Sequence, residues 1–251
     1  MKDASPLPTS GTLDPRLQSV IKIAGLAVGG QGGGVLTGWI VDVAERNGYV
    51  VQSTSVAGVA QRTGATIYYV EMMQDEGRPP VFSLAPAEGD VDILIAAEMM
   101  EAGRAIMRGF VTPDRTTLIA SSHRALATDE KTVPGSGIAS SADVMEAARA
   151  ASAEMLVFDM EAMAQQAGSV ISASLFGALA GSGRLPFPKD SYIETIRASG
   201  RGVDASIRAF ETAFEAARDR AEEATPQAPP ASGVAVARGP AKALGAWDGL
   251  Q

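Results

Sequence analysis

The stretch GLAVGGQGGGVL, residues 25–36, joins an apolar run to a segment with helical periodicity, and it contains six glycines. Glycine permits a positive φ and a close approach of the backbone. A helix that begins after such a turn offers free N–H groups and the positive end of its dipole. A strand, a glycine-rich turn and a helix in this order are the setting in which a glycine fingerprint carries meaning. The stretch therefore predicts a βα unit whose turn receives either an anion or another backbone.

A dinucleotide is the first ligand to consider for such a turn. A nicotinamide-binding fold also needs an acidic residue at the end of its second strand, to bind the ribose. That strand continues here as VVQSTSVAGVAQRTGA, and no Asp or Glu occurs between Arg46 and Val70. This disfavours an NAD(P)-dependent dehydrogenase. The alternative without any ligand is that the glycines only permit tight packing of the strand against the helix.

Outward from the turn, apolar runs alternate with segments of helical periodicity. The predicted strands are 21–28, 49–55, 65–73, 80–85, 91–98, 116–122 and 154–159. The predicted helices are 35–48, 99–110, 142–153, 160–181, 189–199 and 203–224. We expect strands 65–73 and 80–85 to form an antiparallel hairpin. The alternation predicts an α/β protein with a Rossmann-like, mostly parallel sheet, helices on both of its faces and a helical C-terminal part.

Composition changes at both ends of the chain. Residues 1–19 are polar, lack the apolar core of a secretory signal, and are predicted to form a flexible arm. Residues 20–224 are predicted to form one domain. Residues 225–251 are rich in Pro, Ala and Gly, and we expect a flexible tail that includes the start of a further region.

Charge and residue usage exclude several classes of function. The net charge is −8, so the basic stripe of a general nucleic-acid binder is missing. No apolar run reaches the roughly 18 residues of a membrane span, and we expect a cytoplasmic protein. The chain has no cysteine and one histidine. It therefore cannot hold an iron–sulfur cluster on thiolates or build a Cys/His zinc site, so any redox metal must be bound by another chain.

A second informative stretch is SVAGVAQRTGA, residues 55–65, in which Gly58 and Gly64 bracket Gln61 and Arg62. An arginine between glycines and without an acidic neighbour can bind a carboxylate or a phosphate. The alternative is a solvated loop arginine.

Together, GGQGGGVL, the following VAGVAQRTGA and DILIAAEMMEAGRAI at 92–106 resemble the gamma-type domain of 2-oxoacid:ferredoxin oxidoreductases. The resemblance covers about residues 21–220 and is closest to the small-subunit group of the indolepyruvate enzymes. One departure is Ala27, which stands at the first glycine of the G-x-G-G-Q-G turn and would restrict that turn if the position required a positive φ. Another is the tail, because longer bacterial members of the group carry a further C-terminal region.

The resemblance implies a subunit role in the oxidative decarboxylation of an aryl 2-oxoacid, with CoA as co-substrate and ferredoxin as electron acceptor. Thiamine diphosphate, Mg and [4Fe-4S] clusters would be bound by a large partner subunit, and ferredoxin would react through the complex. This chain would bind no metal, carry no catalytic residue and be inactive alone. Residues that would face the substrate, CoA or the partner are Gly29, Gly30, Gln31, Gly32, Gly58, Gln61, Arg62, Gly64 and Glu98. The alternatives are a stand-alone CoA- or nucleotide-binding module and a dehydrogenase.

Other polar residues near predicted strand ends have simpler interpretations. Glu101 and Arg104 are three residues apart and are expected to pair on a helix surface. His123 is expected to be an ordinary loop residue. The methionine pairs 72–73 and 99–100 are expected to fill the core or an interface.

Overall fold

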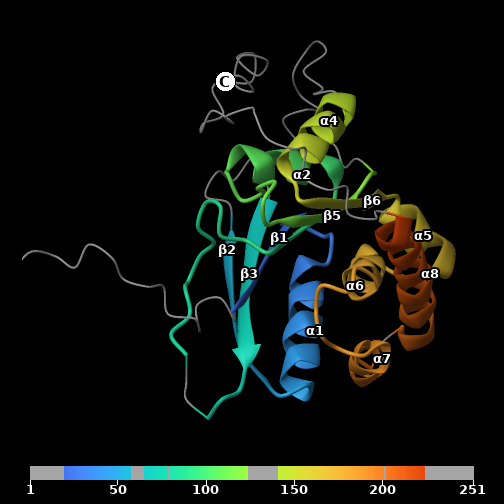
Figure 1. Ribbon diagram of the computed structural model, residues 1–251. Helices are drawn as coiled ribbons and strands as arrows, with labels where there is room; N and C mark the ends of the chain where they lie inside the picture. Colours follow the sequence, from blue (N-terminus) through green and yellow to red (C-terminus); the bar gives the residue numbers. More distant parts are fainter. Residues whose placement is uncertain (1–19, 58–64, 78–79, 124–140, 201, 224–251) are drawn as a thin grey trace, which may run out of the picture.

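The computed structural model describes residues 20–57, 65–77, 80–123, 141–200 and 202–223 (Figure 1). Its strands are β1 (Ile21–Val28), β2 (Tyr49–Ala57), β3 (Ala65–Gln74), β4 (Ile93–Ala96), β5 (Thr117–Ser121) and β6 (Glu154–Phe158). Its helices are α1 (Gly33–Arg46), α2 (Met99–Met107), α4 (Ser141–Ala151), α5 (Met160–Ala167), α6 (Ile171–Gly181), α7 (Lys189–Ala198) and α8 (Val203–Glu223). Among these residues, no helix has the length and apolar character needed to cross a membrane.

The six strands form one sheet in the order β2-β3-β1-β4-β5-β6. β1, β4, β5 and β6 pair in parallel, whereas β3 is antiparallel to both of its neighbours, β1 and β2. The predicted α/β class and mostly parallel sheet are confirmed. The glycine turn is the connection from β1 to α1, so the stretch that opens the fold is a βα unit.

The predicted hairpin between 65–73 and 80–85 is wrong. β3 pairs along one edge with β2 and along the other with β1, so neither edge remains for a further strand. Residues 80–85 are not a strand, and side chains of the sheet hold them instead. The amide of Ser83 donates to Glu71 Oε2 at 2.7 Å, and Thr54 Oγ1 donates to the carbonyl of Leu84 at 2.8 Å.

The single helix predicted over 160–181 is two helices, α5 and α6. Gly168 ends α5 with a φ of 72°, and its amide donates to carbonyl oxygens of the preceding turn. A left-handed residue at this position closes a helix and redirects the chain. The new direction lets α6 run through the middle of the helical layer, where nearly all of its residues are buried.

Two helical layers cover the sheet (Figure 1). One face packs against α1, α5, α6, α7 and α8, and the other packs against α2 and α4. The methionines at 72, 73, 99 and 100 are all buried, which confirms their place in the core. Within the thicker layer, α6 and α8 touch at Gly177 and Gly181. A Cβ at Gly177 would lie 2.2 Å from the carbonyl oxygen of Phe210, and one at Gly181 would lie 2.3 Å from that of Phe214.

We therefore expect Gly177→Ala to lower the free energy of unfolding by about 1–3 kcal/mol, because the methyl group would push backbone away from backbone. Gly38→Ala is the matched control, since a Cβ there meets nothing within 4 Å on the exposed side of α1. It should stabilise the protein by about 0.5–1 kcal/mol through helix propensity. Urea unfolding of both variants checks this, and equal stability of the two would contradict the packing explanation.

Ion pairs hold the parallel strands together at the end of the sheet where these strands begin. Lys22 and Arg115 both pair with Asp90, and Arg115 Nε also lies 2.7 Å from Asp92 Oδ1. Partial burial alone would raise the pKa of the Asp90 carboxyl, but Lys22 and Arg115 outweigh it and the pKa lies below its ordinary value of 3.8. The network connects the starts of β1, β4 and β5.

A carboxyl whose pKa is lowered by folding stabilises the fold above its unfolded pKa and loses this effect as the pH falls through its folded pKa. We expect Asp90→Asn to reduce the free energy of unfolding at pH 7. The gap from wild type should begin to narrow near pH 3.8, the ordinary value for this carboxyl, and close at lower pH. Denaturant titrations at pH 7, 4 and 3 measure the gap. Asp42→Asn, at an exposed position of α1, is the control. A gap independent of pH would show that the charge of Asp90 is not the cause.

Candidate functional site

The carboxyl ends of β1 and β4 lie side by side at one edge of the sheet. The connection from β1 passes through α1 on one face, whereas the connection from β4 passes through α2 on the other face. Open α/β sheets bind their ligands at such a switch point, because the two loops separate there. The glycine turn follows β1. Glu98 lies opposite Val28 when the register of the pair Leu26 and Ala96 is extended by two residues. The structure therefore brings two of the predicted features together.

Gln31 fixes the shape of the turn. Its backbone N–H donates to the carbonyl of Val28 at 3.1 Å, and its side-chain Oε1 accepts from the backbone N–H of Val28 at 2.9 Å. The side chain thus completes a closed pair of hydrogen bonds with one residue of β1. Gly30 and Gly32 have φ values of 90° and 69°, which glycine adopts without strain. Gln31 therefore contributes to the site first by shaping the backbone.

The glycines of the turn differ in whether the structure leaves room for a side chain. A Cβ at Gly33 would lie 2.3 Å from Tyr68 Cε2, and one at Gly32 would lie 2.9 Å from Ser172 Oγ, so both are needed for packing. A Cβ at Gly29 or Gly34 would meet nothing within 4 Å, and both residues are exposed. Packing inside the chain therefore explains Gly32 and Gly33 and leaves Gly29 and Gly34 open to a close approach from outside.

Ala27 departs from the family motif without strain. It lies in β1, paired with Thr66 of β3, and a strand residue needs no positive φ. Its methyl group is buried 3.0 Å from the position of a Cβ on Gly33. The alanine therefore fills space under the start of α1 and leaves the turn itself unchanged.

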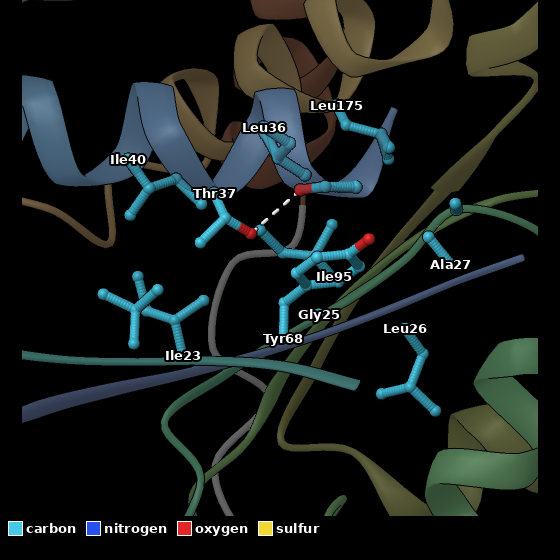
Figure 2. A pocket seen from close by; sticks show the side chains of 13 residues that line it. Ile23, Gly25, Leu26, Ala27, Leu36, Thr37, Ile40, Tyr68, Ile95 and Leu175 are labelled. Atoms are coloured by element: carbon cyan, nitrogen blue, oxygen red, sulfur yellow. Dashed lines mark hydrogen bonds between the residues drawn. The ribbon is translucent and has the colours of Figure 1, made fainter. Parts of the chain in front are cut away.

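A small apolar cavity lies beneath α1, between the helix and the sheet (Figure 2). Leu36, Ile40 and Tyr68 are among its lining residues, and Thr37 directs its hydroxyl to the carbonyl of Gly33 at 2.8 Å. Cofactor sites combine apolar walls with a few converging polar groups. The hydroxyl of Thr37 is already used within the helix, so this cavity is a packing gap below the turn and the candidate site lies above it.

Two helix N-termini meet at the turn. α1 begins after Gly32 and α6 begins after Val170, and neither helix has a side-chain cap or an acidic residue in its first turn. Ser172, in the first turn of α6, is fully buried, and its hydroxyl has no hydrogen-bond partner among the described residues. That hydroxyl is the atom nearest to the position of a Cβ on Gly32. Uncapped N–H groups and two positive dipole ends favour an anion such as a phosphate group. Sequence reasoning missed Ser172, because its proximity to Gly32 depends on the packing of α6.

The second glycine stretch reaches the same edge. Ala57 ends β2 and Ala65 begins β3, and Ala65 pairs with Val28, the last residue before the turn. Gly58, Gln61, Arg62 and Gly64 lie between them, outside the described residues. Their predicted contacts with substrate, CoA or a partner therefore remain predictions, although the strands that flank them end beside the glycine turn.

The acidic residues after β4 have partners within the chain, and the predicted contact of Glu98 with substrate, CoA or a partner stays a prediction. Glu98 is buried, and its Oε1 accepts from the amide of Glu101 at 3.0 Å, which caps α2. Glu101 pairs with Arg104 as predicted, but the expected surface position is wrong because Glu101 is fully buried. Burial raises the pKa of the Glu101 carboxyl, and the charge of Arg104 opposes this only in part. Glu98 therefore lies at the carboxyl ends of the parallel strands, and one of its carboxyl oxygens already caps α2.

His123 follows β5 at the same edge and is held by its neighbours. Its Nδ1 lies 2.8 Å from Ser121 Oγ, and its carbonyl accepts from the amide of Met99 at 3.1 Å. Ser121 Oγ also accepts from the amide of Met160 at 3.1 Å. These contacts join the ends of β4, β5 and β6, so His123 and Ser121 stabilise the edge.

Gly33 and Gly34 are adjacent in the sequence, but a methyl group should affect the free energy of unfolding differently at the two positions. We expect Gly33→Ala to lower the free energy of unfolding by about 1–3 kcal/mol, because its Cβ overlaps the ring of Tyr68. Gly34→Ala should leave stability unchanged or raise it by a few tenths of a kcal/mol. Adding Tyr68→Leu to Gly33→Ala should restore part of the loss if the ring is the cause. Thermal unfolding of these three variants tests this. A loss of stability in Gly34→Ala would refute the distinction between glycines needed for packing and glycines open to the outside.

Solved structures with a similar fold are an oxoacid oxidoreductase and a subunit of another. The pyruvate oxidoreductase subunit PORC of Thermotoga maritima matches 78% of this chain and 96% of its own, with a TM-score of 0.54 and 18% identity. The 2-oxoglutarate:ferredoxin oxidoreductase of Magnetococcus marinus, solved with 2-oxoglutarate, coenzyme A and succinyl-CoA bound, matches 84% of this chain and 32% of its own. Its TM-score is 0.54 and its identity 14%. At these identities the likeness shows the fold.

Curated relatives are closer in sequence. The indolepyruvate oxidoreductase subunits IorB of Thermococcus kodakarensis and Pyrococcus horikoshii are 29% and 30% identical over 195 residues. Each match spans 73% of this chain and 89% of the relative. The model of the family described as pyruvate ferredoxin/flavodoxin oxidoreductase matches residues 21–216. The predicted resemblance is confirmed: the chain belongs to the pyruvate ferredoxin/flavodoxin oxidoreductase family, as a subunit of a 2-oxoacid:ferredoxin oxidoreductase.

Proposed function

We propose that this chain is the small subunit of a thiamine-dependent enzyme that oxidises an aryl pyruvate, such as indolepyruvate, to the acyl-CoA and passes the electrons to ferredoxin. The domain responsible would span residues 20–224. The observation that carries the proposal is the glycine turn at the switch point. Two of its glycines are open to the outside, and two uncapped helix N-termini meet beside it. The similarity to the IorB subunits supports the choice of substrate class.

The role that we propose for the turn is to bind a phosphate group of CoA. The free N–H groups at the start of α1 would donate to the phosphate oxygens, and the positive ends of α1 and α6 would offset their charge. Gly29 and Gly34 would let the ligand approach the backbone closely. Arg62, from the loop between β2 and β3, would add a charge-assisted contact, with Gly58, Gln61 and Gly64 shaping that loop. Coenzyme A in the M. marinus structure supports this ligand class.

The reacting groups would come from the partner. In this class of reaction thiamine diphosphate stabilises the carbanion that decarboxylation leaves. This chain has no cysteine for a cluster, and the described residues bring no three His, Asp or Glu side chains together as metal ligands. A cluster held by cysteine thiolates therefore has no ligands on this chain. We propose that thiamine diphosphate, Mg and the [4Fe-4S] clusters belong to a large subunit, and that this chain binds and orients CoA.

A stand-alone CoA- or nucleotide-binding module is the second candidate, because the same anion site would serve it. Calorimetry with CoA on the purified chain, followed by oxoacid oxidation with a viologen acceptor, separates the two. We expect no turnover by the chain alone and turnover after co-expression with the large subunit. CoA binding by a chain that never assembles with a large subunit would favour the module.

Gly34 and Gly38 provide a matched test of the turn, since both are exposed on α1 and open to a methyl group. In the assembled enzyme, Gly34→Ala should raise KM for CoA about tenfold, roughly 1.4 kcal/mol, because the methyl group intrudes where the ligand meets the first turn. Gly38→Ala, one turn further along, should leave KM unchanged. Equal KM values in wild type and Gly34→Ala would place the CoA phosphate elsewhere.

A further inference from the structure

The segment that follows β3 displays apolar side chains on a fixed backbone. Val81 is 98% exposed and Leu84 is 73% exposed, and we call these two side chains the apolar ridge. The backbone between them is tied to the sheet. Gln52 Nε2 donates to the carbonyl of Ser83 at 2.9 Å, in addition to the bonds from Thr54 to Leu84 and from Ser83 to Glu71. The ridge is therefore held in place and is not a loose apolar loop.

A buried carboxylate supports this arrangement from below. Glu71 is 3% exposed, and its second oxygen accepts from the hydroxyl of Tyr69 at 2.6 Å. Burial and the hydrogen bond to Glu71 raise the pKa of Tyr69, so the phenol remains a donor. Burying a carboxylate is costly unless its oxygens are satisfied. Here the carboxylate fixes the backbone of an exposed segment, which indicates that the position of the ridge matters.

The ridge lies next to a strand whose outer edge pairs with no other described segment, because side chains of β2 hold Ser83 and Leu84. Figure 1 shows the segment passing alongside β2, the outermost strand of the sheet. The amide of Asp75 donates to the carbonyl of Gly48, so even-numbered residues of β2 bond to β3, and the backbone groups of Tyr49, Val51, Ser53 and Ser55 point outward. Among the described residues, no backbone hydrogen bond joins β2 to any segment other than β3.

The chemistry of this edge restricts what can cover it. Sheet edges are normally protected by charges, proline or bulges. β2 and residues 80–85 contain no charged residue, and β2 contains no proline. Outward N–H and C=O groups require a partner with its own backbone groups, which a lipid surface lacks. These properties fit an extended, uncharged polypeptide segment, which would bind such an edge by strand addition.

The same edge leads to the candidate site. β2 ends at Ala57, which pairs with Thr66, and Thr66 pairs with Ala27 just before the glycine turn. Val56 is 46% exposed and lies on the same face of β2 as Thr54, so it extends the apolar surface toward that turn. A net charge of −8 disfavours pairing between two copies of this chain. A different chain that also carries the reacting groups would have to reach the turn from this side or next to it.

We propose that the large subunit docks here: an uncharged extended segment of that subunit adds a strand to β2, and its apolar side chains cover the ridge. This inference rests on the proposed function, because it takes the large subunit as the partner. It assigns the interface to the outer edge of β2 and to Val81 and Leu84.

The test uses the full chain and the purified large subunit. The double variant Val81→Lys/Leu84→Lys and the edge variant Ser53→Lys alter exposed side chains only. Met107→Lys is the control, because Met107 is an equally apolar side chain, 58% exposed, at the end of α2. The Kd for the large subunit should rise at least tenfold for the double variant and for Ser53→Lys, and less than twofold for the control. An unchanged Kd in the folded double variant would overturn the proposal.

Amide hydrogen exchange gives an independent signature. On binding, the outward amides of Tyr49, Val51, Ser53 and Ser55 should become protected, whereas the even-numbered amides are already bonded to β3. Exchange at the four outward amides that is unchanged in a formed complex would refute strand addition. Wild-type chain that binds no large subunit in any condition would refute the proposed function as well. Sedimentation of the chain alone as a dimer that Ser53→Lys dissociates would identify a second copy as the occupant.

Discussion

The structure depends on how closely the start of α1 approaches its neighbours. Gly33 lies against the ring of Tyr68, and Gly32 lies against Ser172 of α6, with no room for a side chain at either position. This contact sets the height of α1 above the sheet and brings the N-terminus of α6 to the same point. The proposed anion site and the packing of the thick helical layer therefore have one cause. A side chain at Gly33 would disturb the fold, and one at Gly34 would disturb only what approaches from outside.

The three buried glutamates each bind a neighbouring group of the chain. Glu98 caps a helix, Glu101 pairs with Arg104, and Glu71 fixes the backbone of an exposed segment. All three are buried, and each has an oxygen bound to a neighbouring group in the chain. These three side chains thus stabilise local structure, and Glu101 Oε2 has no hydrogen-bond partner among the described residues.

Much of the fold could be predicted from the sequence, because the strands and helices around the glycine turn have clear periodicity and are bounded by turn residues. The failures have physical causes that a single sequence does not reveal. Residues 80–85 have the composition of a strand, but β1 and β2 occupy both edges of β3. The break between α5 and α6 depends on a left-handed Gly168 within an otherwise helical pattern. The glycine turn was predictable as a candidate site, whereas the place of Ser172 beside it was not, because that depends on how α6 packs.

The glycine turn and the outer edge of β2 offer different interactions, electrostatic at the turn and hydrogen-bonding and apolar at the edge. One small chain can therefore carry both. At the turn, two helix N-termini place positive dipole ends close together, which favours a compact anion, and close packing leaves little room for side chains. The edge of β2 and the apolar ridge have no charge and extend along a strand, so they select a polypeptide by hydrogen-bond spacing and apolar contact. β2 joins them, since it ends at the level of the turn. If the proposed partner adds a strand to β2, its hydrogen-bond register with β2 would set the distance between its reacting groups and the proposed anion site.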